Sequence, residues 1–536
     1  MTGRCRSLDE FSGENDTARF AAAMKFLRRN PGTELFVPPG TYILTSELAK
    51  KARDGVMSGD FGKNPQKVMF NPKYRYTRGI DFSGQKGTRF SAFGVTLMVD
   101  GFMEPVSVVG CEDVEISGFA IDHVRKPFSR GRVAAVRNCG KARVLTVELD
   151  EACPVERGTP LGLRHLLIDE ETDRAVKISV KNTEFLSPRK LEATVETECE
   201  IPPKALFYVW HTYHSRPAIL IENSKNVRLT DVTIHSQPGM GVVGNRCEDV
   251  TLRRLRVVPS GGDHVSTNTD ATHFTSAKGF LRYEDCVFLR QGDDFANVHA
   301  YYQAVVGREG EKTYLIQEKT PDGTHAQTLD YPDVGDTLEL VSRETLETLG
   351  TYEVKACRPD EDGWLARVEL DRPLPENTGG LMLSDVTRLP ELEIRRCRAE
   401  SHFARGALIK TRSAVVEGCT FKNIMGPAVV AAAESWWWEG VCPANVTVRG
   451  NLIENCGEFF GEASGVVVKA DAARATGQSI FNIVIKDNVI NAPNCRHGIF
   501  VRNASGVHIE NNRIICSGEP VAAENCTGVD IAAPEE

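Results

Sequence analysis

Short runs of alternating apolar and polar residues dominate the hydrophobic pattern of this chain. Many share one sequence motif, the corner motif, in which two alternating stretches flank a small or polar corner residue. These corner residues are Gly118, Asp231, Cys286, Cys397, Cys419, Asn451, Asn488 and Asn512. Undisturbed copies recur at intervals of about 22 to 37 residues. Short strands that turn at Asn, Gly or small residues are typical of stacked coils with three strands each. The pattern therefore predicts an all-β protein built on a parallel β-helix.

Stacking in such a fold places equivalent residues of successive coils in columns. We therefore expect the Cys and Asn corners to form ladders inside the molecule. Cys286, Cys397 and Cys419 are then predicted to be small buried core residues, not redox or metal ligands.

Two stretches interrupt the series of corner motifs, residues 130–216 and 300–388. Both contain alternating strands with charged turns and no coil corner, which predicts small antiparallel barrels or sandwiches inserted into the solenoid. The β-helix is then divided into residues 1–129, which include an N-terminal cap, 217–299 and 389–536. Insertions on one face of a solenoid often shape its binding site.

The N-terminal segment predicts the cap of the solenoid. Residues 16–27 have the apolar spacing and acidic start of a short amphipathic helix, and residues 34–42 follow as a strand and tight turn. A helix in this place would cover the exposed edge of the first coil.

The composition is that of a large soluble globular protein. The chain has 536 residues, of which 26% are charged and 41% hydrophobic, with a net charge of -9. The acidic balance argues against nucleic acid and anionic membranes as partners, and no apolar run is long enough for membrane insertion. No Cys or His cluster has zinc-ligand spacing, and phosphate-loop, GxSxG and HExxH motifs are absent.

The first twenty residues contain no apolar core of the kind found in signal peptides. The chain as it stands is therefore expected in the cytoplasm, or in an extracellular or periplasmic location if a signal was removed. Its sequence leaves open whether it forms a homo-oligomer.

Two acidic motifs are the strongest candidates for chemistry. Asn268-Thr-Asp270 precedes Gln291-Gly-Asp293-Asp294, and Asp270 lies 23 residues before Asp293, about one coil. Residues one coil apart are stacked at the strand spacing of roughly 4.8 Å, so we expect three carboxylates in one patch. Crowded carboxylates repel, and one of them can keep a proton at neutral pH, as the cleavage of a glycosidic bond requires. The alternative is that these Asp residues cap backbone groups at coil turns.

Polar residues near the acidic motifs extend the candidate site. Asn268 precedes Asp270, while Asn297 and His299 follow Asp294 and share one face of an alternating strand. A His beside carboxylates can orient one of them or bind a sugar hydroxyl, and His273 is a second candidate. Each could instead be a structural residue whose hydrogen bonds are satisfied within the fold.

Arg405 and Arg412 lie about one coil beyond the second insertion. An Arg on the same face could pair with the carboxylates and lower the pKa values of two of them, or bind a pair of hydroxyls. The alternative for both is a surface ion pair.

Three consecutive Trp residues lie in the segment that runs from Glu434 to Gly440. If the segment were a strand, Trp437 and Glu439 would share one face, where an indole could stack on a sugar and a carboxylate could hold its hydroxyls. The alternative is a packed coil corner or a contact with an insertion.

The two acidic motifs resemble the three-aspartate site of the β-helical polygalacturonases. A closer overall resemblance is to glycoside hydrolase family 110, the α-1,3-galactosidases. The stretches that carry it are residues 270–274, 286–299, 404–412 and 437–440. The resemblance covers most of the chain from about residue 11 onward.

This resemblance implies a right-handed parallel β-helix interrupted by two small barrels, the second just after the aspartate pair. It implies an exo-acting enzyme that removes terminal α-1,3-linked galactose from blood-group B-type or linear glycans with inversion, without metal or cofactor. Asp293 would be the general acid, while Asp270 and Asp294 would hold and activate the water.

Two other functions remain open from the sequence. One is a polygalacturonase-like hydrolase or a polysaccharide lyase on the same scaffold, although the Trp cluster and the net acidity favour a neutral sugar. The other is a glycan-binding β-helix protein without catalytic activity.

Overall fold

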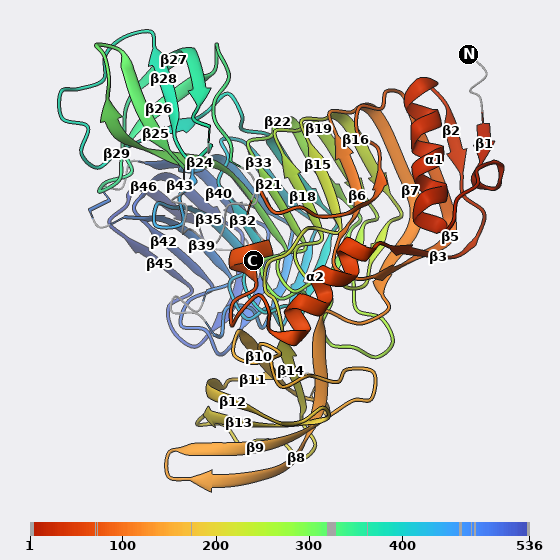
Figure 1. Cartoon of the computed structure of the whole chain (residues 1–536). Helices are drawn as coiled ribbons and strands as arrows, with labels where there is room; N and C mark the ends of the chain where they lie inside the picture. Colours follow the sequence, from red (N-terminus) through yellow and green to blue (C-terminus); the bar gives the residue numbers. More distant parts are fainter. Residues whose placement is uncertain are drawn as a thin grey trace.

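Three parallel sheets run side by side along the molecule and form a β-helix (Figure 1). The structure is a computed structural model that describes residues 5–69, 71, 73–172, 174–318, 329–361, 363–459, 464–472, 474–475 and 479–532. Alternate side chains of the strands point inward and pack into one apolar core that extends through the coils. The predicted class, a parallel β-helix with two antiparallel insertions, is confirmed.

The first sheet extends from the N-terminal to the C-terminal end of the β-helix. In pairing order it contains β1 (Cys5–Ser7), β2 (Glu34–Phe36), β5 (Arg89–Asp100), β7 (Glu112–His123), β16 (Lys225–Thr230), β19 (Glu248–Arg253), β22 (Lys278–Glu284), β30 (Glu391–Arg395), β33 (Ala414–Glu417), β37 (Ala444–Arg449), β40 (Ile480–Lys486), β43 (Ala504–Glu510) and β46 (Thr527–Ala532).

The second sheet begins with β3 (Gly40–Thr45) and passes through the second halves of the long strands β5 and β7. It continues through β17 (Thr233–Ile234), β20 (Arg256–Val257), β23 (Val287–Leu289), β31 (Arg398–Glu400), β34 (Thr420–Lys422), β38 (Leu452–Glu454), β41 (Val489–Ala492) and β44 (Arg513–Cys516).

The third sheet contains the strands that position the candidate site. Its order is β4 (Arg78–Asp81), β6 (Glu104–Val109), β15 (Ile219–Glu222), β18 (Val242–Asn245), β21 (Thr272–Thr275), β24 (Ala296–Arg308), β32 (Ala407–Ile409), β35 (Val429–Glu434), β39 (Val466–Asp471), β42 (Ile499–Arg502) and β45 (Val521–Glu524). The two-residue strand β36 (Glu439–Gly440) joins it antiparallel to β24 and β35.

The corner residues form the expected internal ladder. The backbone N–H of Cys419 donates to Oδ1 of Asn451 at 2.9 Å, Asn451 donates in the same way to Asn488 at 3.0 Å, and Asn488 to Asn512 at 3.1 Å. Cys397 donates to Sγ of Cys419 at 3.3 Å. These side chains are buried, as is Cys286, and all fifteen cysteines are free thiols. The structural role predicted for Cys286, Cys397 and Cys419 is confirmed.

The residue before each corner has a left-handed backbone, which turns the chain between two sheets. Asp285 has a φ of 56°, Asp231 of 55° and Gly118 of 87°. Asp and Gly adopt this conformation at low cost, which explains the polar residues there. The register of β17 with β20 and β23 places Val232, and not Asp231, in the column of Cys286. The corner assignment of Asp231 and Gly118 was therefore wrong by one residue.

The N-terminal helix covers the first coil, as predicted. Helix α1 (Asp16–Arg29) begins at Asn15, whose side chain accepts the N–H of Ala18 at 3.0 Å. Its buried face packs on the core next to β3 and β4. Three further helices were not predicted: η1 (Leu8–Glu10), α2 (Glu47–Ser58) and α3 (Gln66–Met69).

The first insertion is a seven-stranded antiparallel sheet with its own apolar core. The order of its strands is β11 (Arg174–Val176), β10 (Arg164–Asp169), β14 (Leu206–Trp210), β8 (Phe128–Cys139), β9 (Ala142–Leu149), β13 (Lys190–Glu196) and β12 (Ser179–Ser187). It projects below the β-helix in Figure 1.

The second insertion is a closed six-stranded antiparallel barrel. Beyond the β-helix, β24 pairs with β25 (Thr313–Gln317) and β29 (Leu381–Asp385), and β28 (Ala366–Leu370), β27 (Thr348–Pro359) and β26 (Thr337–Ser342) complete the ring. A separate apolar core fills it. One continuous strand thus links the β-helix to the barrel.

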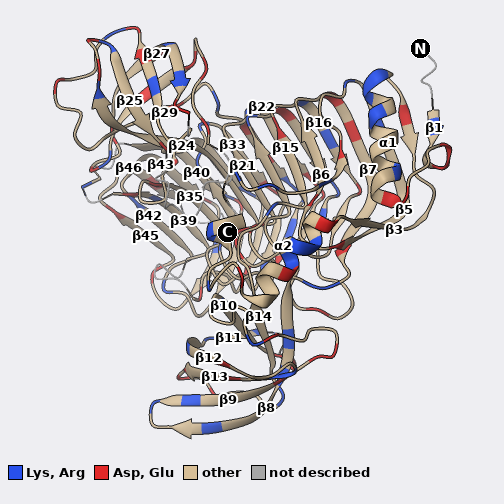
Figure 2. Ribbon diagram, viewed as in Figure 1, with Lys and Arg blue, Asp and Glu red and all other residues tan. Residues whose placement is uncertain are grey.

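Basic and acidic residues are interspersed over the β-helix and both insertions (Figure 2). No helix in the described part of the chain has the length and apolarity needed to span a membrane.

Candidate active site

The strand register determines which acidic residues stack. Thr272 of β21 pairs with Ala296 of β24, an offset of 24 residues, so Asp294 lies next to Asp270 in the adjoining coil. The backbone N–H of Ala271 accordingly donates to the carbonyl of Asp294 at 2.9 Å. The expectation that Asp270 stacks on Asp293 was wrong by one residue. Since neighbouring residues of an extended chain point to opposite sides, Asp293 and Asp294 have different surroundings.

Gly292 allows the two coils to approach at this point. Its N–H donates to the carbonyl of Thr267 at 2.9 Å, and a Cβ atom at Gly292 would lie 2.0 Å from the carbonyl oxygen of Asn268. Any larger residue would push the aspartate pair away from the neighbouring coil.

Asp294 is held by Arg405, which lies opposite it in the next coil because Ala296 pairs with Ala407. Arg405 donates its backbone N–H to Oδ1 at 2.9 Å, Nε to Oδ1 at 3.1 Å and Nη2 to Oδ2 at 2.9 Å. Burial raises the pKa of Asp294 to about 7, with Asp293 and Asp270 adding to the shift and Arg405 opposing it. Three donors to one carboxylate fix its orientation.

Asp270 begins a chain of hydrogen bonds through two imidazoles. His273 donates from Nδ1 to Oδ2 of Asp270 at 2.7 Å, and its Nε2 lies 2.9 Å from Nε2 of His299. His299 donates from Nδ1 to the carbonyl of Ala300 at 2.9 Å. Burial raises the pKa of Asp270 and lowers that of His299 to about 3, so the His299 ring is neutral at neutral pH.

Asp293 contacts two residues of the first insertion. Tyr213, which follows β14, donates its hydroxyl to Oδ2, and Nη1 of Arg164 in β10 lies 3.8 Å from the same oxygen. Burial raises the pKa of Tyr213 well above its usual value, so the phenol remains a donor. Sequence reasoning missed both residues, and the only signal was the polar run from His211 to Arg216 at the end of the insertion.

A second set of charges lies beside the three carboxylates. Lys410 is fully buried, and its Nζ lies 2.7 Å from Oε2 of Glu439, 3.0 Å from Oε2 of Glu434 and 3.2 Å from Oδ1 of Asn297. Glu434 also accepts from Nη1 of Arg405 at 2.7 Å, and Asn297 donates to Glu439 at 3.1 Å. Although burial opposes ionisation, Lys410 and both imidazoles lower the pKa of Glu439 well below its usual value.

Lys410 was not among the predicted site residues. It follows the apolar strand β32 at the position where the chain leaves the third sheet. A Lys directly after a buried strand was the signal that could have indicated it.

Two predicted site residues have other partners. Asn268 donates to the carbonyl of Thr212 at 2.7 Å and thereby ties the coil to the end of the first insertion. Arg412 donates to Glu339 of the barrel at 2.7 Å. Both contacts join an insertion to the β-helix.

The Trp segment is a turn between β35 and β36 instead of a strand. Trp437 donates its backbone N–H to the carbonyl of Glu434 at 3.1 Å, so strand alternation does not relate it to Glu439. Trp436 and Trp437 are partly exposed, with ring centroids 4.8 Å apart. The ring of Trp438 instead packs against Arg343 of the barrel, whose guanidinium carbon lies 4.6 Å from the ring centroid.

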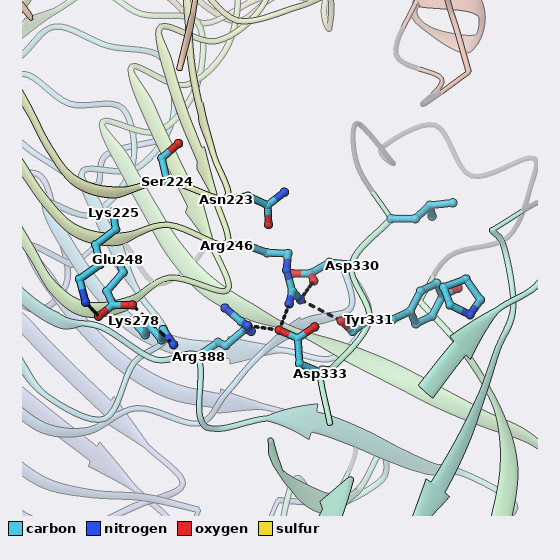
Figure 3. A pocket seen from close by; sticks show the side chains of 12 residues that line it. Asn223, Ser224, Lys225, Arg246, Glu248, Lys278, Asp330, Tyr331, Asp333 and Arg388 are labelled. Atoms are coloured by element: carbon cyan, nitrogen blue, oxygen red, sulfur yellow. Dashed lines mark hydrogen bonds and ion pairs between the residues drawn. The ribbon is translucent and has the colours of Figure 1, made fainter. Parts of the chain in front are cut away.

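A separate charged pocket of about 470 Å³ lies between the β-helix and the barrel (Figure 3). Arg246 pairs there with Asp330 and Asp333, and Arg388 reaches Asp333 from the other side. Figure 3 also shows Glu248 between Lys225 and Lys278.

Similarity to known proteins agrees with this architecture. Residues 379–532 match the family model described as right handed beta helix region. Alpha-1,3-galactosidase A of Bacteroides fragilis (strain ATCC 25285) is 24% identical over an alignment of 535 positions, which covers 94% of this chain and 85% of that protein. Alpha-1,3-galactosidase A of Shewanella woodyi is 25% identical, and the alignment covers 95% of this chain and 84% of that protein. Alpha-1,3-galactosidase B of Parabacteroides distasonis is 24% identical, and the alignment covers 78% of this chain and 71% of that protein. The resemblance found in the motifs is thus confirmed: this chain is a distant homologue of the alpha-1,3-galactosidases A and B, built on a right-handed β-helix.

Proposed function

We propose that this protein is a glycosidase that releases terminal α-1,3-linked galactose from glycans with inversion of the anomeric carbon. The observation that carries the proposal is the carboxylate cluster of Asp270, Asp293 and Asp294 on adjacent coils. Three carboxyl groups with different partners can divide the acid and base roles that glycoside hydrolysis requires. The distant homology to alpha-1,3-galactosidases supports the same reaction.

Asp293 is suited to be the general acid. Its side chain is 27% exposed, against 7% for Asp270 and 3% for Asp294, so it can reach a leaving oxygen that carries the rest of the glycan. Tyr213 and Arg164 approach its Oδ2, and Oδ1 is therefore the oxygen that would carry the proton.

Asp270 and Asp294 would hold the water on the other face of the sugar. In the inverting step, the water oxygen bonds to the anomeric carbon while the glycosidic bond breaks. One proton of the water passes to Asp270, and the proton of Asp293 passes to the leaving oxygen. Arg405 keeps Asp294 oriented toward the water, and His273 does the same for Asp270. Inversion requires the acid and the base to lie roughly 6.5–9.5 Å apart.

The charge balance of the site favours a neutral sugar. Arg164 approaches Asp293, Arg405 pairs with Asp294, and Lys410 pairs with Glu439, so these cations are already compensated. A uronate would bring a further negative charge into a site that contains many carboxylates. Trp436 and Trp437 offer partly exposed indole faces on the turn before Glu439.

The test is incubation with p-nitrophenyl α-galactoside, Gal-α-1,3-Gal, a fucosylated blood-group B oligosaccharide and polygalacturonate, followed by proton NMR. Initial release of β-galactose from an α-1,3-linked substrate is the expected result, and the relative rates distinguish branched from linear glycans. An initial α-anomer would contradict inversion. An unsaturated product would indicate a lyase, and tight glycan binding without cleavage would indicate a binding protein.

A further inference from the structure

His273 and His299 face each other through the same type of nitrogen. Their Nε2 atoms lie 2.9 Å apart, and their rings are almost perpendicular, at 87°. Each Nδ1 is already engaged, by Oδ2 of Asp270 at 2.7 Å and by the carbonyl of Ala300 at 2.9 Å. When both Nδ1 atoms carry protons, both Nε2 atoms present lone pairs, and a proton or a cation must lie between them.

A third donor atom points at the same place. Oε1 of Glu439 lies 3.9 Å from Nε2 of His299, and Lys410 and Asn297 both bind the other carboxylate oxygen, Oε2. The donor atoms of His273, His299 and Glu439 all lie within 4.8 Å of one another. Two imidazoles and a carboxylate are a known set of zinc ligands that leaves a fourth position for water.

We propose that Nε2 of His273, Nε2 of His299 and Oε1 of Glu439 bind a divalent transition-metal ion of the Zn²⁺ type, which takes the place of the proton between the rings. The ion acts as an inhibitor at the candidate active site, a role that rests on the proposed function. It would fix His273, and through it Asp270, while occupying space beside the water that Asp270 activates.

The surroundings match those of a metal centre. Metal-bound His residues usually donate their second N–H to a carboxylate or a backbone carbonyl, and Asp270 and Ala300 supply one of each. Tetrahedral zinc with Zn–N bonds of about 2.0–2.1 Å would need the nitrogens about 3.3 Å apart, so the rings separate by only a few tenths of an ångström.

The net charge of the site is also compatible with a divalent cation. The site contains five carboxylates and three cations, which leaves two negative charges when all are ionised: Asp270, Asp293, Asp294, Glu434 and Glu439 against Arg164, Arg405 and Lys410. The side chains of His273 and Glu439 are 14% and 16% exposed, so an ion can enter from the solvent side.

The experiment measures metal binding directly. Exposed thiols at Cys5, Cys139 and Cys199 are first replaced by Ser, because they could bind the metal themselves. This variant is titrated with Co²⁺ at pH 7.5 and then with Zn²⁺. We expect one Co²⁺ per chain with the visible absorption of a tetrahedral site, and displacement of Co²⁺ by Zn²⁺.

Two variants test the ligands in that background. Glu439→Gln and His299→Ala should each weaken Co²⁺ binding by more than about 100-fold. Loss of a residue that only orients a metal ligand costs at most about 100-fold in affinity, so a larger loss identifies a ligand. The control His508→Gln removes an exposed imidazole on another coil and should bind as tightly as the parent. Circular dichroism and the melting temperature verify that each variant is folded.

Absence of Co²⁺ binding, or binding that Glu439→Gln leaves unchanged, would overturn the proposed metal site. Inhibition of p-nitrophenyl α-galactoside cleavage by Zn²⁺, reversed by EDTA, is the functional readout. If Co²⁺ binds as expected but no galactoside is cleaved, the proposed function fails while the metal site stands.

Discussion

Two clusters of charged side chains in this molecule look alike in composition but differ in construction. The interdomain cluster joins the β-helix to the barrel. It contains Arg246, Asp330, Asp333 and Arg388, which Figure 3 shows, together with Asp336 and Asp385. The candidate active site also combines Asp and Glu with Arg and Lys. In the interdomain cluster, however, the cations lie between the carboxylates and tie two structural units together. The candidate active site adds two facing imidazoles and two indoles.

The comparison shows that a perturbed pKa does not by itself identify a catalytic group. Burial and the neighbouring Asp336 raise the pKa of Asp385 to about 8, and burial raises that of Asp294 to about 7. Both are protonated more readily than an ordinary Asp. Exposure does not separate the two either, because Asp333 of the interdomain cluster is 57% exposed and Asp293 is 27% exposed. Asp294 differs in lying next to Asp270, which is hydrogen-bonded to the first of two facing imidazoles. The neighbours of a carboxyl group, and not its pKa or exposure alone, therefore distinguish the candidate active site, and the following predictions test that distinction.

The largest expected effect is on catalysis, at Asp293. The substitution Asp293→Asn removes the transferable proton while preserving shape, and loss of general-acid catalysis should lower kcat by about 10²–10⁴-fold. Steady-state kinetics with p-nitrophenyl α-galactoside and with Gal-α-1,3-Gal measure it. The activated nitrophenolate needs less protonation, so its loss should be the smaller of the two.

The matched control is Asp333→Asn in the interdomain cluster, which makes the same chemical change outside the candidate active site. Its kcat per folded molecule should equal that of the unmodified protein. A comparable loss of kcat in both variants would remove the distinction between the two clusters.

The next effect is on stability, at Arg388. Its side chain is only 10% exposed, and its guanidinium faces Asp333, Asp336 and Asp385. Arg388→Met leaves the buried Asp336 and Asp385 without this cation, while Asp333 keeps Arg246, and breaking a buried pair costs about 3–5 kcal/mol. Urea unfolding followed by circular dichroism should show an earlier transition, while kcat of the folded protein stays the same.

Arg367→Met serves as the control on the same barrel. Arg367 is 52% exposed and pairs with Glu309, and an exposed pair contributes about 0–1 kcal/mol. If both Arg variants shifted the urea transition equally, burial would not be what makes the interdomain cluster important for stability.

The sequence predicted the β-helix well because the corner motif is formed by residues that are adjacent in the chain. Alternation gives each strand an inward face, and small or amide corners such as Asn451 stack on their equivalents. The register was less predictable, because the loops between strands differ in length. A spacing of 23 residues suggested that Asp270 stacks on Asp293, whereas the strand pairing has an offset of 24 at this coil.

The site was predictable only where its residues lie on the coils themselves. His273 and His299 lie on strands β21 and β24 close to the acidic motifs in the sequence, and Arg405 lies about one coil beyond the second insertion, so these positions indicated them. Arg164 and Tyr213 reach Asp293 from an insertion far away in the sequence, and no spacing rule relates them to it. The Trp run formed a turn because Trp437 hydrogen-bonds back to the carbonyl of Glu434, which alternation does not anticipate.

A smaller effect concerns pH. With the pKa of Asp294 at about 7, its carboxylate form, which would orient the water, is lost as the pH falls through 7. We expect kcat/KM to decrease about tenfold per pH unit below that value. Arg405→Gln removes a charge that lowers this pKa, so the acidic limb should move to higher pH. Asp385→Asn in the interdomain cluster should leave the acidic limb of the kcat/KM profile unchanged. An acidic limb near pH 4 in the unmodified protein would contradict the role of Asp294.

The smallest effect is expected at the Trp turn, which adjoins both the candidate active site and the barrel. Trp437→Ala removes an exposed indole next to Trp436, and the loss of a stacking contact of about 0.5–1.5 kcal/mol should raise KM by roughly 2- to 12-fold with kcat preserved. Trp438, one residue further, packs on Arg343 of the barrel, so Trp438→Ala should lower the melting temperature instead of raising KM. Adjacent indoles would thus separate the two functions of the turn, substrate binding and attachment of the barrel. Equal KM values for Trp437→Ala and the unmodified protein would place the sugar elsewhere in the site.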